Sequence, residues 1–210
     1  TAAAEVVTQR IVHAGGQALA VQADVADPAQ VDALFATVQQ HWGHIDCLVN
    51  NAGIIDARSR FTDMTLARWQ AMFATNVFGS FLCARAAVRH MSTAHGGRGG
   101  SIVNVGSTAS RLGAGGRYVD YAASKGAIDS FTIGLAQEVA AEGIRVNCVR
   151  PGVVDTDIHT DSPAQMQQRA QAIPLQRLGT PEEIAQTIVW LASPAASYVT
   201  GALLDVAGGR

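Results

Sequence analysis

The sequence has few charged residues and no excess of either sign. Only 15% of its 210 residues are charged, and 15 basic and 17 acidic side chains give a formal net charge of −2. A nucleic-acid-binding protein needs a basic excess to neutralise phosphates, so that class is excluded. Long hydrophobic runs are also absent. No apolar stretch reaches the roughly eighteen residues of a membrane span, which predicts a soluble protein with no membrane partner.

Cysteine is scarce, and its spacing suggests no pairing. Cys47, Cys83 and Cys148 form no CxxC pair, and an odd number of cysteines cannot all be bridged. Disulfides are rare in reducing compartments, so the pattern predicts a cytoplasmic protein. A metal site is not expected either, because His41 and His44 lie at the end of an expected helix with no third ligand nearby.

Lysine is nearly absent. Lys125 is the single lysine beside 14 arginines. A coding bias toward arginine explains this for most surface positions. Arginine does not take part easily in proton transfer, however, whereas the compact ammonium of lysine does. Lys125 is therefore a candidate for chemistry.

The residues that are present predict a folded α/β domain. Hydrophobic residues make up 48% of the chain, which is enough for one core, and residues 1–210 fit a single domain better than two. Strand-like and helix-like segments alternate, which predicts a doubly wound parallel sheet between two layers of helices. The expected strands are 18–25, 45–49, 101–105, 144–149 and 202–206. The main expected helices are 28–42, 66–91, 121–142 and one that begins after Thr180 and ends before Pro194.

One part of such a sheet is not found. A glycine-rich phosphate turn normally follows its first strand, but none precedes Ala18. If 18–25 is the third strand, the two strands that belong between it and 45–49 are missing, which would leave a gap of about 10 Å. We therefore expect the sequence given to lack the first strands, a βαβ unit of roughly 30 residues.

Tyr121 and Lys125 are four residues apart on an expected helix, so both side chains project from one face. An ammonium near a phenol favours the phenolate and lowers the tyrosine pKa, which suits general acid/base chemistry on a substrate oxygen. Tyr118 is an alternative, but Lys125 then lies seven residues away, which favours Tyr121. Ser107 follows the expected strand 101–105, where its hydroxyl would point into the ligand crevice.

These residues resemble the short-chain dehydrogenase/reductase (SDR) family. The resemblance covers essentially the whole chain. It is specific because five separate motifs occur in the family's order. They are Asn50-Asn51-Ala52-Gly53, Asn76, Ser107, Tyr121-x-x-x-Lys125 and Pro151-Gly152. The resemblance implies a Rossmann-like fold and hydride transfer between NAD(P) and a small-molecule alcohol or carbonyl. From the resemblance alone, NADP is preferred over NAD.

The resemblance also implies roles for four catalytic residues. Tyr121 would be the general acid/base and Ser107 would orient the substrate oxygen. Lys125 would lower the tyrosine pKa and hold the nicotinamide ribose, and Asn76 would anchor a water in a proton relay. Many members have Ser-Ser where this chain has Gly106-Ser107. The loop to Tyr121 is also one residue longer than usual, so Ser110 is a minor alternative to Ser107.

The implied cofactor-binding residues lie in three segments. Asp24 and Val25 would lie at the adenine, although Asp24 could instead cap the following turn. Asn50, Ala52 and Gly53 would lie beside the adenosine ribose, partly in a structural role. A third segment would hold the carboxamide, and it comprises Pro151, Gly152, Val154 and Thr156. The residues that choose between NAD and NADP cannot be named, because the glycine-rich turn is absent.

Several alternatives stay open. The enzyme could be a sugar- or alcohol-type dehydrogenase, or a 3-oxoacyl-carrier-protein reductase that docks an acidic carrier on Arg85, Arg89 and Arg98. A non-catalytic cofactor-binding or sensor protein on the same fold is a third reading. The resemblance further implies a homotetramer formed through the helices 66–91 and 121–142. The acidic segment with Asp155, Asp157, His159 and Asp161 is expected to be a substrate lid (155–178) rather than a metal site.

Overall fold

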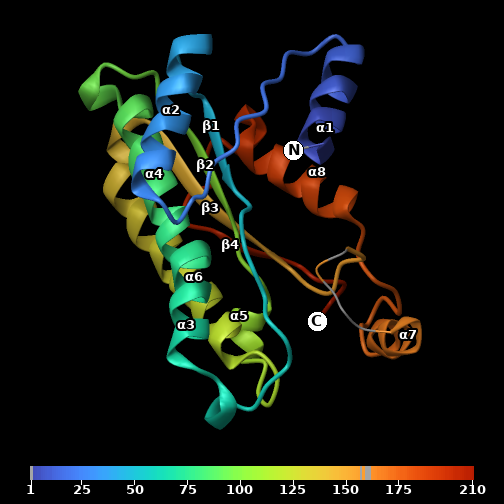
Figure 1. The fold of residues 1–210 in the computed structure, drawn as a ribbon. Helices are drawn as coiled ribbons and strands as arrows, with labels where there is room; N and C mark the ends of the chain where they lie inside the picture. Colours follow the sequence, from blue (N-terminus) through green and yellow to red (C-terminus); the bar gives the residue numbers. More distant parts are fainter. Residues whose placement is uncertain (1, 157, 159–161) are drawn as a thin grey trace.

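A computed structural model describes residues 2–156, 158 and 162–210. Its centre is a parallel sheet of four strands in the order β1-β2-β3-β4, which are β1 (Cys47–Asn50), β2 (Gly100–Val105), β3 (Ile144–Pro151) and β4 (Leu203–Val206). Helices cover both faces of this sheet (Figure 1). The α/β fold with a parallel, doubly wound sheet is therefore confirmed.

The helices agree closely with the expected ones. One face of the sheet carries α2 (Pro28–Trp42), α4 (Ser80–Met91) and α6 (Val119–Val139), and the other carries α8 (Pro181–Ala192). Helix α1 (Ala2–His13) is drawn on the same side as α8 (Figure 1), and none of its residues is buried. The remaining helical elements are α3 (Leu66–Phe73), α5 (Ala109–Leu112), α7 (Pro163–Gln171), the π-helical segment η2 (Ala74–Gly79) and the 3-10 turns η1 (Phe61–Asp63), η3 (Thr93–His95), η4 (Ala140–Glu142) and η5 (Pro194–Ala196).

Helix α2 begins and ends where its sequence signals predict. The Asp27 side chain accepts hydrogen bonds from the first backbone N–H groups, Pro28 occupies the first helical position, and Gly43 ends the helix at φ 74°. The left-handed conformation of Gly43 has no steric cost for glycine. Val31 and Phe35 on its inner face are buried against α4.

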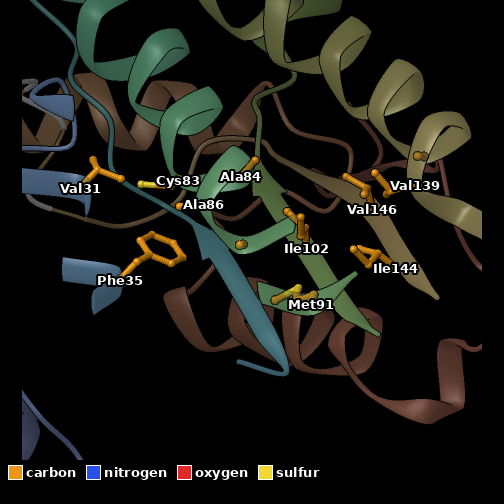
Figure 2. Packing of buried hydrophobic residues seen from close by; sticks show 12 residues of the cluster. Val31, Phe35, Cys83, Ala84, Ala86, Met91, Ile102, Val139, Ile144 and Val146 are labelled. Atoms are coloured by element: carbon orange, nitrogen blue, oxygen red, sulfur yellow. The ribbon is translucent and has the colours of Figure 1, made fainter. Parts of the chain in front are cut away.

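The two core clusters lie on opposite faces of the sheet. The larger one joins α2, α4 and α6 to β2 and β3 (Figure 2). The smaller one packs Ile184 and Leu191 of α8 against Val103 and Val149. Because β2 and β3 are covered on both faces, they are buried along most of their length instead of alternating between buried and exposed positions.

The expected strand 18–25 is wrong. These residues are extended but form no strand, and most are exposed. A strand needs a hydrogen-bonded neighbour, and none of the described strands lies beside this segment. Strands β1 to β4 are contiguous and β1 forms one edge, so among the described residues no strand lies between 18–25 and β1, where the gap was expected.

The expectation that no segment could span a membrane also needs correction. The helical run Leu66–Met91 has 26 residues and a window of mean hydropathy 1.3, which passes by length and composition. Half of that window is buried in the protein. A core helix gives the same pattern, and α4 packs against β1 and β2 in this way.

Candidate functional site

A cavity of about 860 Å³ opens at the carboxyl ends of β2 and β3. Open parallel sheets bind their ligands at this edge, in the crevice where the loops after neighbouring strands diverge. Val105 and Pro151, the last residues of the two strands, both line it. Of the sequence-predicted residues, the cavity brings together Gly53, Ser107, Tyr121, Lys125, Pro151, Gly152, Val154 and Thr156.

Helix α6 holds Tyr121 and Lys125 on the face that lines this cavity. The Lys125 ammonium nitrogen lies 5.7 Å from the centre of the Tyr121 ring and donates a 2.8 Å hydrogen bond to the carbonyl of Val105. Lys125 is only 5% exposed. The spacing of four residues therefore places the ammonium beside the phenol, as expected from the sequence.

Burial controls the proton affinities of both groups. It raises the pKa of Tyr121 above its usual value, and a hydrogen bond with Ser107 opposes this rise. It also lowers the pKa of Lys125 to about 8, although the charges of Cys148 and Asp129 act in the opposite direction. The lowered tyrosine pKa expected from the sequence is therefore not found. Desolvation disfavours the charged form of each side chain.

Ser107, the serine favoured in the sequence, lies in the cavity wall, whereas Ser110 does not. The Ser107 hydroxyl accepts a 3.1 Å hydrogen bond from the Ala109 N–H, and the Ser110 hydroxyl donates to the Ser107 carbonyl at 2.8 Å. Tyr118 also lines the cavity, and its hydroxyl accepts from Nε of Arg58 at 3.1 Å. Ser107 and Tyr121 thus line the same wall, and Ser107 opposes the rise in the tyrosine pKa.

Asn76 lies behind the cavity wall and is 0% exposed. Its side chain accepts from the Ile54 N–H at 2.8 Å and donates to the Ile54 carbonyl at 3.0 Å and to Ser124 at 3.1 Å. Ser124 in turn donates to the Tyr121 carbonyl at 2.7 Å. The side-chain amide therefore joins the loop after Gly53 to helix α6. It sits in η2, and π-helical segments are frequent at functional sites.

The predicted cofactor residues fall into two groups. Those after β3 lie in the cavity, and the short parallel bridge between Val154 and Gly179 fixes the start of the following segment. Gly53 leaves space beside the ammonium, because a Cβ there would lie 3.6 Å from Lys125 Nζ. The missing side chain at Gly53 lets a ligand come close to the backbone. Together with the Lys125 ammonium and the Thr156 hydroxyl, this space fits the ribose and nicotinamide of NAD(P).

The other predicted cofactor residues lie outside the cavity lining, namely Asp24, Val25, Asn50 and Ala52. Asp24 is exposed and accepts a 2.9 Å hydrogen bond from the Ala26 N–H, so it caps the turn before α2. Asn50 is buried and donates to Asn104 at 2.9 Å across β1 and β2. Its contacts are structural.

Sequence reasoning missed several parts of the cavity. Within the expected lid, helix α7 contributes Gln165 and Arg169 to the lining, and a capping box at Ser162 and Gln165 was the available signal for this helix. Asp157, His159 and Asp161 lie outside the described residues. In the rest of the chain, no three His, Cys, Asp or Glu side chains gather as a metal site. The ion pair between Arg68 and Asp120 behind Tyr121 was missed as well.

Comparisons with known proteins show the family to which the chain belongs. A family model described as enoyl-(acyl carrier protein) reductase matches residues 1–210. The uncharacterized oxidoreductase YgfF of Escherichia coli (strain K12) is 52% identical over 210 residues, which cover 99% of this chain and 85% of that protein. A 3-oxoacyl-[acyl-carrier-protein] reductase of Synechocystis sp. is 41% identical over 208 residues, covering 99% of this chain and 81% of that protein.

Solved structures agree as well. A short-chain dehydrogenase/reductase from Serratia marcescens BCRC 10948 has a TM-score of 0.91 at 36% identity, covering 98% of this chain and 82% of that chain. A blue fluorescent protein from a metagenomic library, in complex with NADPH, has a TM-score of 0.90 at 35% identity, covering 98% of this chain and 81% of that chain. The chain belongs to the short-chain dehydrogenase/reductase family and is an NAD(P)-dependent oxidoreductase.

Proposed function

We propose that this oxidoreductase interconverts a small-molecule carbonyl and its alcohol with Tyr121 as the general acid/base. The supporting observation is that Ser107, Tyr121 and Lys125 meet at one wall of a cavity at the carboxyl ends of β2 and β3. This wall contains a proton donor, a second hydroxyl and a cation close to each other. A protein that only bound a cofactor would need none of these for proton transfer.

The residues divide the reaction between them. When bound, NAD(P) would supply the hydride for carbonyl reduction and would accept it in alcohol oxidation. Tyr121 donates its phenolic proton to the carbonyl oxygen, which becomes the alcohol. Ser107, which lines the same wall, orients the same oxygen. The ammonium of Lys125, 5.7 Å from the ring centre, stabilises the phenolate left behind.

We propose that Gly53, Lys125 and the segment Pro151–Thr156 hold the nicotinamide and its ribose, and that NADP is preferred over NAD. The structural relative solved with NADPH supports this preference. Titration of the protein with NADPH and NADH, followed by cofactor fluorescence, tests it. Tighter binding of NADH would contradict it.

The replacement Tyr121→Phe tests the acid/base role. It removes the proton and leaves the ring, so turnover should fall by about 10²–10⁴-fold, as expected for the loss of a general acid. NADPH affinity should change little, because the ring and Lys125 remain. Steady-state kinetics and cofactor titration are measured on the same preparation. Retained turnover in Tyr121→Phe would refute the assignment and would leave the fold unaffected.

A 3-oxoacyl-carrier-protein reductase is a second candidate. The 41% identical relative from Synechocystis sp. favours it, and the description of the family model names an acyl carrier protein as well, although for an enoyl reductase. An acidic carrier would need a basic face, and Arg85, Arg89 and Arg98 are exposed on α4 and the turn that follows it. A salt-sensitive preference for carrier-bound over free substrate would support this function. Equal rates at all ionic strengths would favour a sugar- or alcohol-type dehydrogenase.

We also propose that α4 and α6 carry the interface of a homotetramer. Large apolar side chains are exposed there, among them Phe81 at 37% and Ile133 at 40%. Phe81 packs against Phe131 with ring centres 4.2 Å apart, so the two helices present one aromatic surface. Light scattering during size-exclusion chromatography measures the assembly, and a monomer would contradict the proposal.

A further inference from the structure

A largely buried ion pair involves Asp120, the residue before Tyr121. Asp120 is in the first turn of α6, and Arg68 is in the first turn of α3. Nε of Arg68 donates to one carboxylate oxygen of Asp120 at 2.6 Å and Nη2 donates to the other at 3.3 Å. The two side chains are 11% and 1% exposed. A two-point contact between a guanidinium and a carboxylate fixes both orientation and distance.

The same pair connects three segments of the site. Asp120 also accepts a 2.9 Å hydrogen bond from the Tyr121 N–H, and Arg68 donates through Nη1 to the carbonyl of Ala57 at 2.7 Å. Burial is the largest single influence and raises the pKa of Asp120, but the hydrogen bonds from Arg68 and from the Tyr121 N–H, together with the charge of Arg68, hold this pKa below its usual value. The carboxylate thus stays charged and keeps the loop at Ala57, helix α3 and the start of α6 together.

This junction lies where two loops frame the cavity. The residue after Ala57 is Arg58, which bonds the Tyr118 hydroxyl at 3.1 Å, and both line the cavity. The backbone of the same loops is also joined, because the Ser59 N–H donates to the Arg117 carbonyl at 3.0 Å. A shift of the ion pair would therefore move the cavity wall and the backbone of Tyr121 together.

We propose that Arg68 and Asp120 are positioning residues that set the distance between the Tyr121 hydroxyl and the substrate oxygen. The proposal rests on the proposed role of Tyr121. Apolar residues of similar volume often stabilise a protein as well as a buried ion pair does, because of the desolvation cost of the charges. An apolar pair of the same volume would not reproduce the two-point contact, which fixes the geometry of the segments beside the acid/base.

The test separates positioning from folding. Asp120→Ala and Arg68→Met remove one partner each, and Asp120→Asn and Arg68→Lys are milder changes that keep part of the contacts. Val31→Ala is the control, since Val31 is 1% exposed in the core between α2 and α4 and does not line the cavity. For each protein, kcat, KM, NADPH affinity and the melting temperature are measured, with wild type and Tyr121→Phe alongside.

A displacement of about 1 Å at a reacting group can reduce the rate about 10²-fold, so kcat of Asp120→Ala and Arg68→Met should fall by about this factor. NADPH affinity should stay within about twofold, because neither side chain lines the cavity. Arg68→Lys keeps the positive charge but loses the two-point contact of the guanidinium. Its kcat should therefore lie between those of wild type and Arg68→Met. Val31→Ala should lower the melting temperature and keep its kcat.

Two results would overturn the proposal. The first is that the folded variants Asp120→Asn and Arg68→Lys, and also either Asp120→Ala or Arg68→Met, keep a kcat within about twofold of wild type. So small a change is far below the expected loss. The other is a loss of kcat in Val31→Ala equal to that in Asp120→Ala at the same fall in melting temperature. Failure of the proposed function would look different, because Tyr121→Phe would then keep the turnover of wild type.

Discussion

Replacing Asn76 by alanine should uncouple the loop after Gly53 from helix α6. The side chain joins the two by three hydrogen bonds, to the N–H and the carbonyl of Ile54 and to Ser124, at 2.8, 3.0 and 3.1 Å. Ser124 bonds the Tyr121 carbonyl, so the acid/base lies one hydrogen bond further along. Asn76→Ala removes all three contacts and leaves a small cavity behind the site.

The size of the effect follows from these contacts. Each hydrogen bond contributes about 0.5–1.5 kcal/mol net, so the loss of three should cost roughly 2–4 kcal/mol of unfolding free energy. For a protein of this size, each kcal/mol lowers the melting temperature by about 2–4 °C, which gives a fall of roughly 4–16 °C. If the loop moves by about 1 Å, kcat should also fall by about 10²-fold.

Asn147 provides a matched control. It is likewise 0% exposed, and its amide donates to the Val199 carbonyl at 2.9 Å and accepts from the Ala202 N–H at 3.0 Å. Asn147 lies on β3 outside the cavity lining. Thermal denaturation and steady-state kinetics are measured for both alanine variants. Asn147→Ala should lose stability and keep kcat, and an equal loss of kcat in both variants would refute the positioning role of Asn76.

Two further predictions concern pH and packing. The rate of carbonyl reduction should be constant up to about pH 8 and fall above it as Lys125 loses its proton, whereas alcohol oxidation should rise through pH 10 because burial raises the pKa of Tyr121. pH–rate profiles in both directions measure this, and a reduction rate that is flat to pH 10 would contradict it. Gly106→Ser should lower the melting temperature through about 1–3 kcal/mol of overpacking, since a Cβ at this position would lie 2.6 Å from the Cys148 sulfur and 3.1 Å from Arg150. An unchanged melting temperature in differential scanning calorimetry would exclude that clash.

Local signals in the sequence predicted the elements that their own residues define. Asp27, Pro28 and Gly43 mark the ends of α2 because caps act through backbone groups a few residues away. The spacing of Tyr121 and Lys125 likewise places them on one helical face. By contrast, 18–25 has the composition of a strand but no partner, and a strand depends on a neighbour that local composition does not specify.

Long-range contacts could not be predicted in this way. Arg68 and Asp120 are 52 positions apart, and their charges in the sequence are no different from those of surface residues. The residues next to Asn76 in the sequence also give no sign that its side-chain amide forms hydrogen bonds with Ile54 and Ser124. Both contacts exist because α3, η2 and α6 pack around one junction, so only the assembled fold shows them.

The protonation state of the site is another property of the assembled fold. In the sequence, a lysine four residues from a tyrosine predicts a lowered tyrosine pKa, since the pair is treated as if it were in water. In the structure both groups lie in a largely buried wall, where desolvation is the largest influence on each. At neutral pH this leaves Tyr121 as a phenol and Lys125, with a pKa of about 8, mostly as an ammonium. A phenol beside an ammonium holds the proton that carbonyl reduction consumes, whereas alcohol oxidation must first remove it.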